Sequence, residues 1–127
     1  MTIVGTLIRG RGEAAEFTRL DWVVRQSVAA VGIDPFPGTV NVKLEVPEAI
    51  RTWTRLRKSP GHPIVPPAGS SFCTARCYPV AIGTLPAAAI VPDVPGYPDD
   101  SIEIIAAIGV REQLGIDDGD QVTLQAA

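Results

Sequence analysis

Histidine, cysteine and aromatic residues are scarce in this sequence, and their scarcity excludes several kinds of active site. Aromatic residues make up 6% of the 127 residues, and His62 is the only histidine. A Ser-His-Asp or Cys-His arrangement would have to depend on that one residue, which lies in a proline-rich segment. Cys73 and Cys77 are the only cysteines, whereas zinc sites usually need four ligands. We therefore interpret both cysteines as ordinary core or surface residues.

Long hydrophobic runs and an excess of positive charge are also absent. No apolar run reaches the ~18 residues that a membrane-spanning helix needs. The N-terminal stretch "MTIVGTLIRGRGE" does not have the layout of a signal peptide. The formal net charge of -3 disfavours broad binding to nucleic acid or to anionic membranes. We therefore expect a cytoplasmic protein that binds neither nucleic acid nor membrane, whereas the sequence does not indicate an oligomeric state.

Glycine and proline, by contrast, are abundant, with 12 of each. This composition favours many short strands and turns over a helical bundle. The chain is long enough for one domain with its own core, and we expect a single domain over residues 1–127. Alternating or strongly apolar segments predict strands at 2–10, 39–46, 72–83 with an interruption at Pro79, 85–92, 101–108 and near the end of the chain. The sequence therefore predicts a mainly β protein, a small six-stranded barrel.

The spacing of apolar residues in 18–31 predicts one principal helix, which we expect to pack against the barrel. Thr18 is its candidate N-cap, and Gly32 suits the position that follows its C-terminus. Apolar residues recur at helical spacing, and we expect four valines to be buried on one face: Val23, Val24, Val28 and Val31. Shorter features are predicted elsewhere: a helix that begins near Pro47, a loop over residues 61–71 and a helical turn that ends at Gly115.

The segment "GRGEAAE", residues 10–16, is a candidate phosphate-binding loop. Gly10 and Gly12 would let the backbone approach a phosphate closely, and successive N–H groups can surround it. Arg9 and Arg11 add positive charge. The segment lacks the full GxGxxG pattern, and the chain has no Walker-type GK[ST] motif. An ordinary turn is therefore the alternative.

The segment "PFPGTVN", residues 35–41, is a candidate metal site. Thr39 and Asn41 are two positions apart on a predicted strand, so their side chains share a face roughly 6.5–7 Å apart along the backbone. Neutral oxygens of this kind bind Mg²⁺ weakly by themselves, but they suit a Mg²⁺ ion whose charge is balanced by substrate phosphates. The alternative is a polar outer face on which both residues serve the turn.

Carboxylates occur in two further places of interest. Glu103 interrupts the apolar run "SIEII", and a carboxylate among buried neighbours needs a partner. Glu103 is therefore either an edge residue in solvent or a group that receives a hydroxyl or N–H group of a ligand. The aspartates of "DDGD", Asp117, Asp118 and Asp120, look like a metal cluster, but we interpret them as solvated turn residues.

Three segments in the same order and at compatible spacing, "GRGE", "GIDPFPGTVNVKL" and "IEIIAAIGVREQLGIDDGDQVTL", resemble the archaeal-type CTP-dependent riboflavin kinase family. The resemblance runs through nearly the whole chain and is weakest between residues 46 and 72. It implies a six-stranded barrel of the cradle-loop type. It also implies Mg²⁺-dependent transfer of the γ-phosphate of CTP to riboflavin, which gives FMN and CDP.

The resemblance also assigns residues to the metal and to the two substrates. It implies that Thr39 and Asn41 bind magnesium and that Glu103 contacts the flavin. Glu103 is also the nearest candidate for a catalytic base. The resemblance places nucleotide binding on two segments: Gly10, Arg11, Gly12, Glu13, Ala14, Ala15 and Glu16 in the first, and Ile108, Gly109, Val110 and Arg111 in the second.

The sequence departs from the family pattern in both substrate loops. Ala14 and Ala107 replace a glycine and a proline of the family, and alanine does not take a φ > 0 conformation freely. Pro95 and Tyr97 stand where a threonine and a histidine approach the flavin, although Tyr97 offers a ring for stacking. Two alternatives therefore stay open: a kinase of this fold with another nucleotide or acceptor, and a non-catalytic barrel that binds a nucleotide or a flavin or has no ligand.

Overall fold

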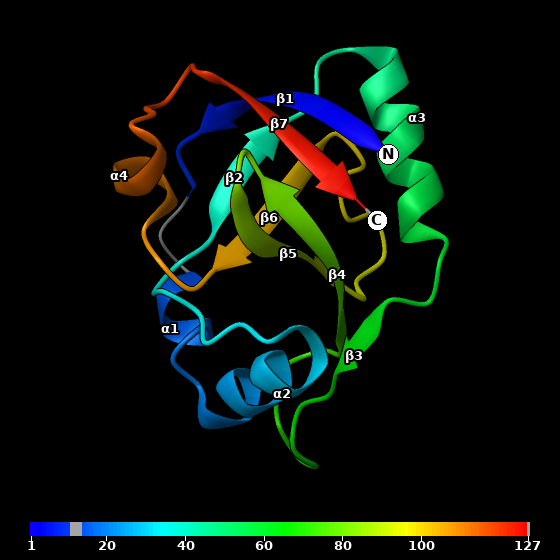
Figure 1. The fold of residues 1–127 in the computed structure, drawn as a ribbon. Coiled ribbons are helices and arrows are strands. Elements are labelled where there is room, and N and C mark those ends of the chain that lie inside the picture. Colours follow the sequence, from blue (N-terminus) through cyan, green and yellow to red (C-terminus); the bar gives the residue numbers. More distant parts are fainter. Residues whose placement is uncertain (11–13, 127) are drawn as a thin grey trace.

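The computed structural model describes residues 1–10 and 14–126, and its centre is a closed antiparallel β-barrel (Figure 1). Within these residues the strands are β1 Thr2–Ile8, β2 Val40–Lys43, β3 His62–Ile64, β4 Ala75–Ile82, β5 Leu85–Pro92, β6 Ser101–Ala106 and β7 Gln121–Ala126. The barrel runs in the order β4, β5, β6, β2, β1, β7 and closes because β7 also pairs with β4. The predicted six-stranded barrel is confirmed, and β3 adds a strand beside β4.

Four helices lie around the barrel in the described residues. They are α1 Ala14–Phe17, α2 Asp21–Val31, α3 Pro47–Arg57 and α4 Val110–Leu114. Figure 1 shows α3 at the upper right, α4 at the left, and α1 and α2 in the lower part. The two longest helices lie at the top and the bottom of the molecule in Figure 1: α3 packs beside β1, and α2 packs on β3 and β4. None of these helices is long and apolar enough to cross a membrane.

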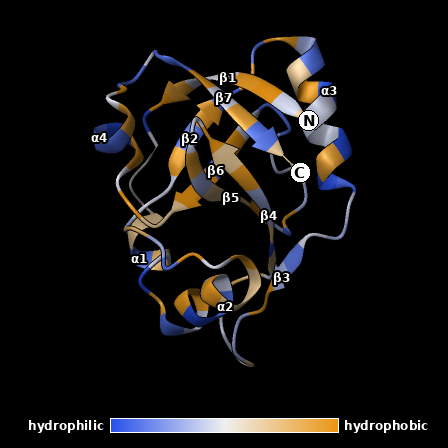
Figure 2. Cartoon of the chain, in the orientation of Figure 1, coloured by the Kyte–Doolittle hydropathy of each residue, from blue (hydrophilic) through white to orange (hydrophobic). Residues whose placement is uncertain are grey.

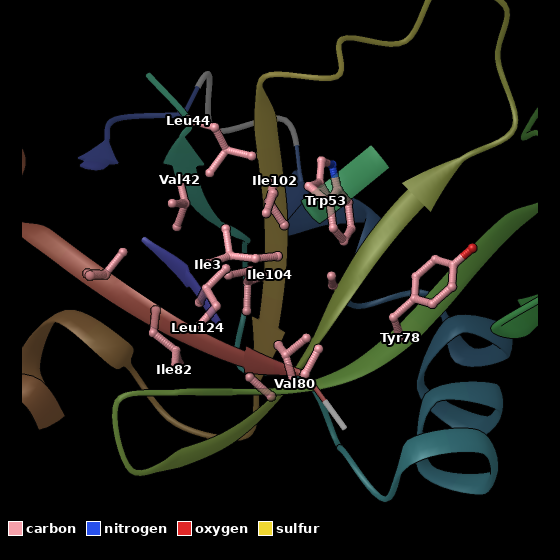
Figure 3. Close-up of a cluster of buried hydrophobic side chains, with 14 of the residues drawn as sticks. Ile3, Val42, Leu44, Trp53, Tyr78, Val80, Ile82, Ile102, Ile104 and Leu124 are labelled. Carbon is pink, nitrogen blue, oxygen red and sulfur yellow. The ribbon is translucent and has the colours of Figure 1, made fainter. Parts of the chain in front are cut away.

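Aliphatic side chains fill the barrel because every second residue of its strands points inward. Figure 3 shows these side chains converging from opposite walls, and Figure 2 shows the apolar colouring concentrated on the strands. The largest of them are at most 1% exposed: Ile3, Leu7, Val42, Leu44, Ile102, Ile104 and Leu124, with Ile82 and Trp53. Trp53 comes from α3, so this helix closes one end of the barrel core.

A second, smaller core lies between α2 and the outer face of β4, β5 and β6. It contains Ile33, Ile64, Ala75, Cys77, Ala88, Ile90 and Ile105. Small residues on the middle strand, such as Ala88, allow the helix and the loop after it to approach the sheet. Burial in this core raises the pKa of the Cys77 thiol to about 11, so Cys77 stays a protonated packing residue. Cys73 is exposed and precedes β4.

The principal helix begins three residues later than predicted, because Thr18 does not cap it. Leu20 occupies the N-cap position without a side-chain hydrogen bond, and α2 begins at Asp21. Thr18 is instead 1% exposed, and its hydroxyl bonds to the backbone of neighbouring segments. The predicted C-terminus is confirmed, since Gly32 takes a left-handed conformation with φ 72° and its N–H donates to Val28.

The predicted buried face of this helix is wrong in part. Val23 is 2% exposed and Val24 and Val31 are half-buried, whereas Val28 is 48% exposed. The small Ser27 takes the buried place beside Val23, so the contact face is rotated away from Val28. This rotation follows from the sheet that the helix covers, which the helical spacing alone does not reveal.

The pair Val23 and Val28 offers a direct test of this packing. We expect Val23→Ala to lower the free energy of unfolding by roughly 0.5–3 kcal/mol, as buried truncations do. The same truncation at the exposed Val28 should stay within about 0.5 kcal/mol of the parent protein. Urea denaturation followed by circular dichroism measures both, and equal losses would contradict the packing of α2 described above.

Two further strand predictions need correction. Residues 61–71 were expected to form a loop, but His62–Ile64 pair with β4 as β3. The expected interruption at Pro79 does not occur, because β4 runs through this residue, which pairs with Ala88. Pro79 lies between the part of β4 that pairs with β3 and the part that pairs with β7. Neither β3 nor β7 pairs with Pro79 itself. A proline is tolerated there because its missing N–H removes no hydrogen bond to β3 or β7.

Candidate functional site

A cleft of about 1080 Å³ opens beside the barrel where several loops meet. Its walls come from the C-terminal end of β1, from α1, from the turn before β2, from the loop and first half of β6, and from the turn between α4 and β7. Figure 1 shows α1, α4 and the end of β1 on the same side of the barrel. The cleft exceeds the roughly 300–1,000 Å³ of most small-molecule sites, so it has room for more than one ligand.

Thr39, Asn41 and Glu103 form the polar centre of this cleft. Thr39 immediately precedes β2, Asn41 lies in it, and Asn41 pairs directly with Glu103 on β6. The Thr39 hydroxyl donates to one oxygen of the Glu103 carboxylate at 3.4 Å. The Asn41 amide nitrogen donates to the Thr39 carbonyl at 3.5 Å. Adjacent strands therefore bring three oxygen-bearing side chains to one place, and all three are half-buried.

The turn that precedes Thr39 is fixed by a hydrogen bond to Thr18. Gly38 has a φ of 95°, which a glycine adopts freely, and its N–H donates to the Thr18 hydroxyl at 2.9 Å. The same hydroxyl lies 3.0 Å from the carbonyl oxygens of Ala14 and Ala15, to which it donates. One buried side chain thus ties α1 to the turn, and both segments line the cleft.

Gly10 allows Asn41 to take its position. A Cβ atom at residue 10 would lie 2.3 Å from the amide nitrogen of Asn41, closer than non-bonded atoms approach. Any other residue at position 10 would therefore displace the Asn41 amide or the backbone at the end of β1. The predicted nucleotide segment and the predicted metal pair are in direct contact at this point.

Tyr97 covers the other side of Glu103. Its hydroxyl donates to the second carboxylate oxygen of Glu103 at 2.5 Å. Burial raises the pKa of Tyr97, and the hydrogen bond to the Glu103 carboxylate raises it further, so Tyr97 stays a donor. The guanidinium of Arg57 lies 5.7 Å from the centre of the Tyr97 ring and donates to the Pro98 carbonyl. The Tyr97 ring thus has Arg57 over one face, and it also packs against the barrel core.

A second, smaller cavity of about 330 Å³ adjoins the cleft. The two share four lining residues, Pro37, Gly38, Thr39 and Arg111. On its far side the smaller cavity is lined by the ring of Phe36 and by residues 108–112. Thr39 and Arg111 therefore stand at the boundary between the two cavities.

Most of the residues assigned by resemblance line one of these cavities, and a few do not. Gly10, Ala14, Ala15, Thr39, Asn41, Tyr97, Glu103 and Arg111 line the cleft, and Ile108, Gly109 and Val110 line the smaller cavity. Glu16 and Pro95 are exposed and line neither, so the structure does not bring them to the site. The predictions for Arg11, Gly12 and Glu13 lie outside the described residues.

Three residues at the site were not predicted to act there. Arg57 received no role in the sequence analysis, and Thr18 was interpreted as a helix cap. Asp118 was interpreted as a solvated turn residue, yet it lines the cleft and contacts Arg111. The motif "DDGD" was a signal for Asp118, whereas no pattern in the sequence pointed to Arg57.

The donor set at the centre of the cleft suits a divalent cation that arrives with its substrate. No group of three or more histidine, cysteine, aspartate or glutamate residues that could hold a metal occurs in the described part of the chain. Thr39 and Asn41 instead offer neutral oxygens next to a single carboxylate. Mg²⁺ accepts such oxygen ligands when phosphates and water complete its shell. The residues present therefore fit a phosphate-bound Mg²⁺ better than a permanently bound ion.

Comparison with known proteins places these features in a family. The family model CTP-dep_RFKase, described as "Domain of unknown function DUF120", matches residues 7–126. The chain belongs to this family. The riboflavin kinases of Methanoregula boonei, Methanocella arvoryzae and Saccharolobus solfataricus are 32%, 39% and 32% identical to it, over 99%, 93% and 97% of the chain. The resemblance to CTP-dependent riboflavin kinases is thereby confirmed.

The chain matches only part of most of these relatives. It spans 57% of the Methanoregula boonei riboflavin kinase, 53% of the one from Methanocella arvoryzae and 72% of the one from Saccharolobus solfataricus. The match to the CTP-dependent riboflavin kinase model nevertheless includes every described residue that lines the two cavities.

Proposed function

We propose that this protein transfers the γ-phosphate of CTP to riboflavin in a Mg²⁺-dependent reaction, giving FMN and CDP. The observation that carries the proposal is the convergence of Thr39, Asn41 and Glu103 in the larger cleft, where Thr39 also borders the smaller cavity. A phosphoryl donor and its acceptor must meet with their reacting atoms ~3–3.5 Å apart. The family match and the relatives named riboflavin kinase support this choice of substrates.

In this proposal the nucleotide lies across the boundary between the cavities. Its phosphates lie near Gly10, Ala14 and Ala15, whose backbone N–H groups would donate to them, and near Arg111. Mg²⁺ held by the Thr39 and Asn41 oxygens would balance the charge of the phosphates. The remainder of the nucleotide extends toward residues 108–110 in the smaller cavity.

The acceptor lies in the larger cleft, beside Glu103 and Tyr97. The ribityl 5′-hydroxyl oxygen forms a bond to the γ-phosphorus, the bond from this phosphorus to the β–γ bridging oxygen breaks, and CDP leaves. Glu103 accepts the hydroxyl proton. A carboxylate has about four lone-pair sites, and Thr39 and Tyr97 occupy one each, so room for a substrate hydroxyl remains.

The test is an assay of FMN formation with riboflavin, Mg²⁺ and each of the four nucleoside triphosphates in turn. We expect FMN with CTP and far less with ATP, GTP or UTP, and none when EDTA replaces Mg²⁺. FMN formed equally well with another triphosphate would identify a kinase of different nucleotide preference. No FMN with any of the four, together with unchanged riboflavin fluorescence on addition of protein, would contradict the proposal.

A further inference from the structure

We propose that Asp118 is a positioning residue that holds the guanidinium of Arg111 toward the phosphates of the nucleotide; this inference rests on the proposed function. Asp118 and Arg111 both line the cleft, and Arg111 also lines the smaller cavity. One carboxylate oxygen of Asp118 lies 2.6 Å from Nη2 of Arg111. This contact joins the turn before β7 to helix α4, and both residues line the cleft.

Among the residues that the structure describes, Arg111 is held through one nitrogen, Nη2. Its Nη2 donates to the Ile8 carbonyl at 3.3 Å and contacts Asp118, so this nitrogen is fixed between the end of β1 and the turn. Within the described residues, Nε and Nη1 of Arg111 make no hydrogen bond. A guanidinium has five N–H donors in a rigid fork, and fixing one nitrogen orients the others. The unoccupied donors are therefore available to an anion at the boundary of the two cavities.

The turn that carries Asp118 is itself rigidly attached to the barrel. The N–H of Gly119 donates to the Leu7 carbonyl, and the N–H of Leu7 donates to the Asp120 carbonyl, each at 2.8 Å. The Asp120 carboxylate accepts the N–H of Asp117 at 2.8 Å. The turn thus places the Asp118 carboxylate at a defined point beside the end of β1.

The charge of Asp118 does not make this corner of the cleft acidic. Its second carboxylate oxygen lies 3.7 Å from Nε of Arg9, which also lines the cleft and whose side chain is 88% exposed. Asp117 also lines the cleft here, so two guanidinium groups and two carboxylates balance, and the oriented N–H donors of Arg111, not a net charge, attract phosphates. Arg9 is mostly solvated and contributes little to the position of Asp118, whereas the contact with Arg111 is shorter and joins side chains that are 38% and 43% exposed.

The test measures the KM for CTP and for riboflavin in four variants and in the parent protein. The variants are Asp118→Ala, Asp118→Asn, Arg111→Ala and the double variant Asp118→Ala/Arg111→Ala. We expect Asp118→Ala to raise the KM for CTP about 10-fold or more, with the KM for riboflavin unchanged. Asp118→Asn, which keeps an acceptor for Arg111, should lose less. In the Arg111→Ala background, removal of Asp118 should add almost nothing, because its effect passes through Arg111. Additive losses would overturn the inference.

Asp21→Ala is the matched control, because it breaks an exposed ion pair with Arg25 on α2, away from the cleft. It should leave both KM values unchanged. Binding of inorganic tripolyphosphate with Mg²⁺, measured by calorimetry, supplies a readout that does not need turnover. Weaker binding in Asp118→Ala supports the inference even if the wild-type protein makes no FMN, in which case the proposed function alone fails. Tripolyphosphate binding unaffected by Asp118→Ala, or absent in the wild-type protein, would overturn the inference.

Discussion

Replacing Glu103 with glutamine is expected to lower kcat for FMN formation by about 10²–10⁴-fold, the usual contribution of a general base. Glutamine has nearly the same shape and still accepts a hydrogen bond, but it does not take a proton from the ribityl hydroxyl. Glu103 lies directly across from Asn41 and within 3.4 Å of the Thr39 hydroxyl, which places its carboxylate next to the proposed point of transfer. Steady-state kinetics with each substrate varied in turn measure the effect.

The same kinetics separate a catalytic role from a binding role. If Glu103 only binds the flavin, Glu103→Gln raises the KM for riboflavin and leaves kcat near that of the parent protein. Tyr97→Phe is the control, because it removes the other donor to Glu103 but keeps the ring beside Arg57. We expect this variant to lose far less than Glu103→Gln, since it keeps the carboxylate. A loss as large as that of Glu103→Gln would assign the essential role to Tyr97.

The sequence was sufficient to predict the barrel and the shared face of Thr39 and Asn41, because both depend on local patterns, whereas the metal role of this pair stays a prediction. Alternation in residues 39–46 placed Thr39 and Asn41 on the face opposite Val42 and Leu44, and the structure buries those two apolar side chains. The turn residues Gly32 and Gly115 ended their helices as predicted, since both take left-handed conformations. Such features need only near neighbours in the chain.

The connections between distant segments were not predictable in this way. The role of Thr18 depends on Gly38, 20 residues later, and the role of Asp118 on Arg111 and the end of β1. Arg57 reaches Tyr97 only because α3 and the loop before β6 lie together. Thr18 looked like a cap, Asp118 looked like a turn residue, and Arg57 had no signal at all, because their partners come close only in the folded barrel.

Asn41→Ala is expected to weaken nucleotide binding by about 10–100-fold or more in the presence of Mg²⁺ and to change it little in the presence of EDTA. Substitutions around bound metals that leave the ligands in place already cost about 10–100-fold, so loss of a ligand should cost at least as much. Asn41 offers its side-chain oxygen beside Thr39, and its amide nitrogen lies against Gly10. Calorimetric titration with CDP, with and without Mg²⁺, measures both values.

Gly10→Ala distinguishes a metal role of Asn41 from a general effect on the cleft. The added methyl group would meet the Asn41 amide at 2.3 Å. It should therefore displace the Asn41 side chain but leave the amide group itself in the protein. We expect Gly10→Ala to reproduce the Mg²⁺-dependent loss of Asn41→Ala, and the two substitutions together to cost little more than either alone, because both act on the same amide. Equal losses with and without Mg²⁺ in both variants would mean that Asn41 shapes the turn and the nucleotide loop but does not bind the metal.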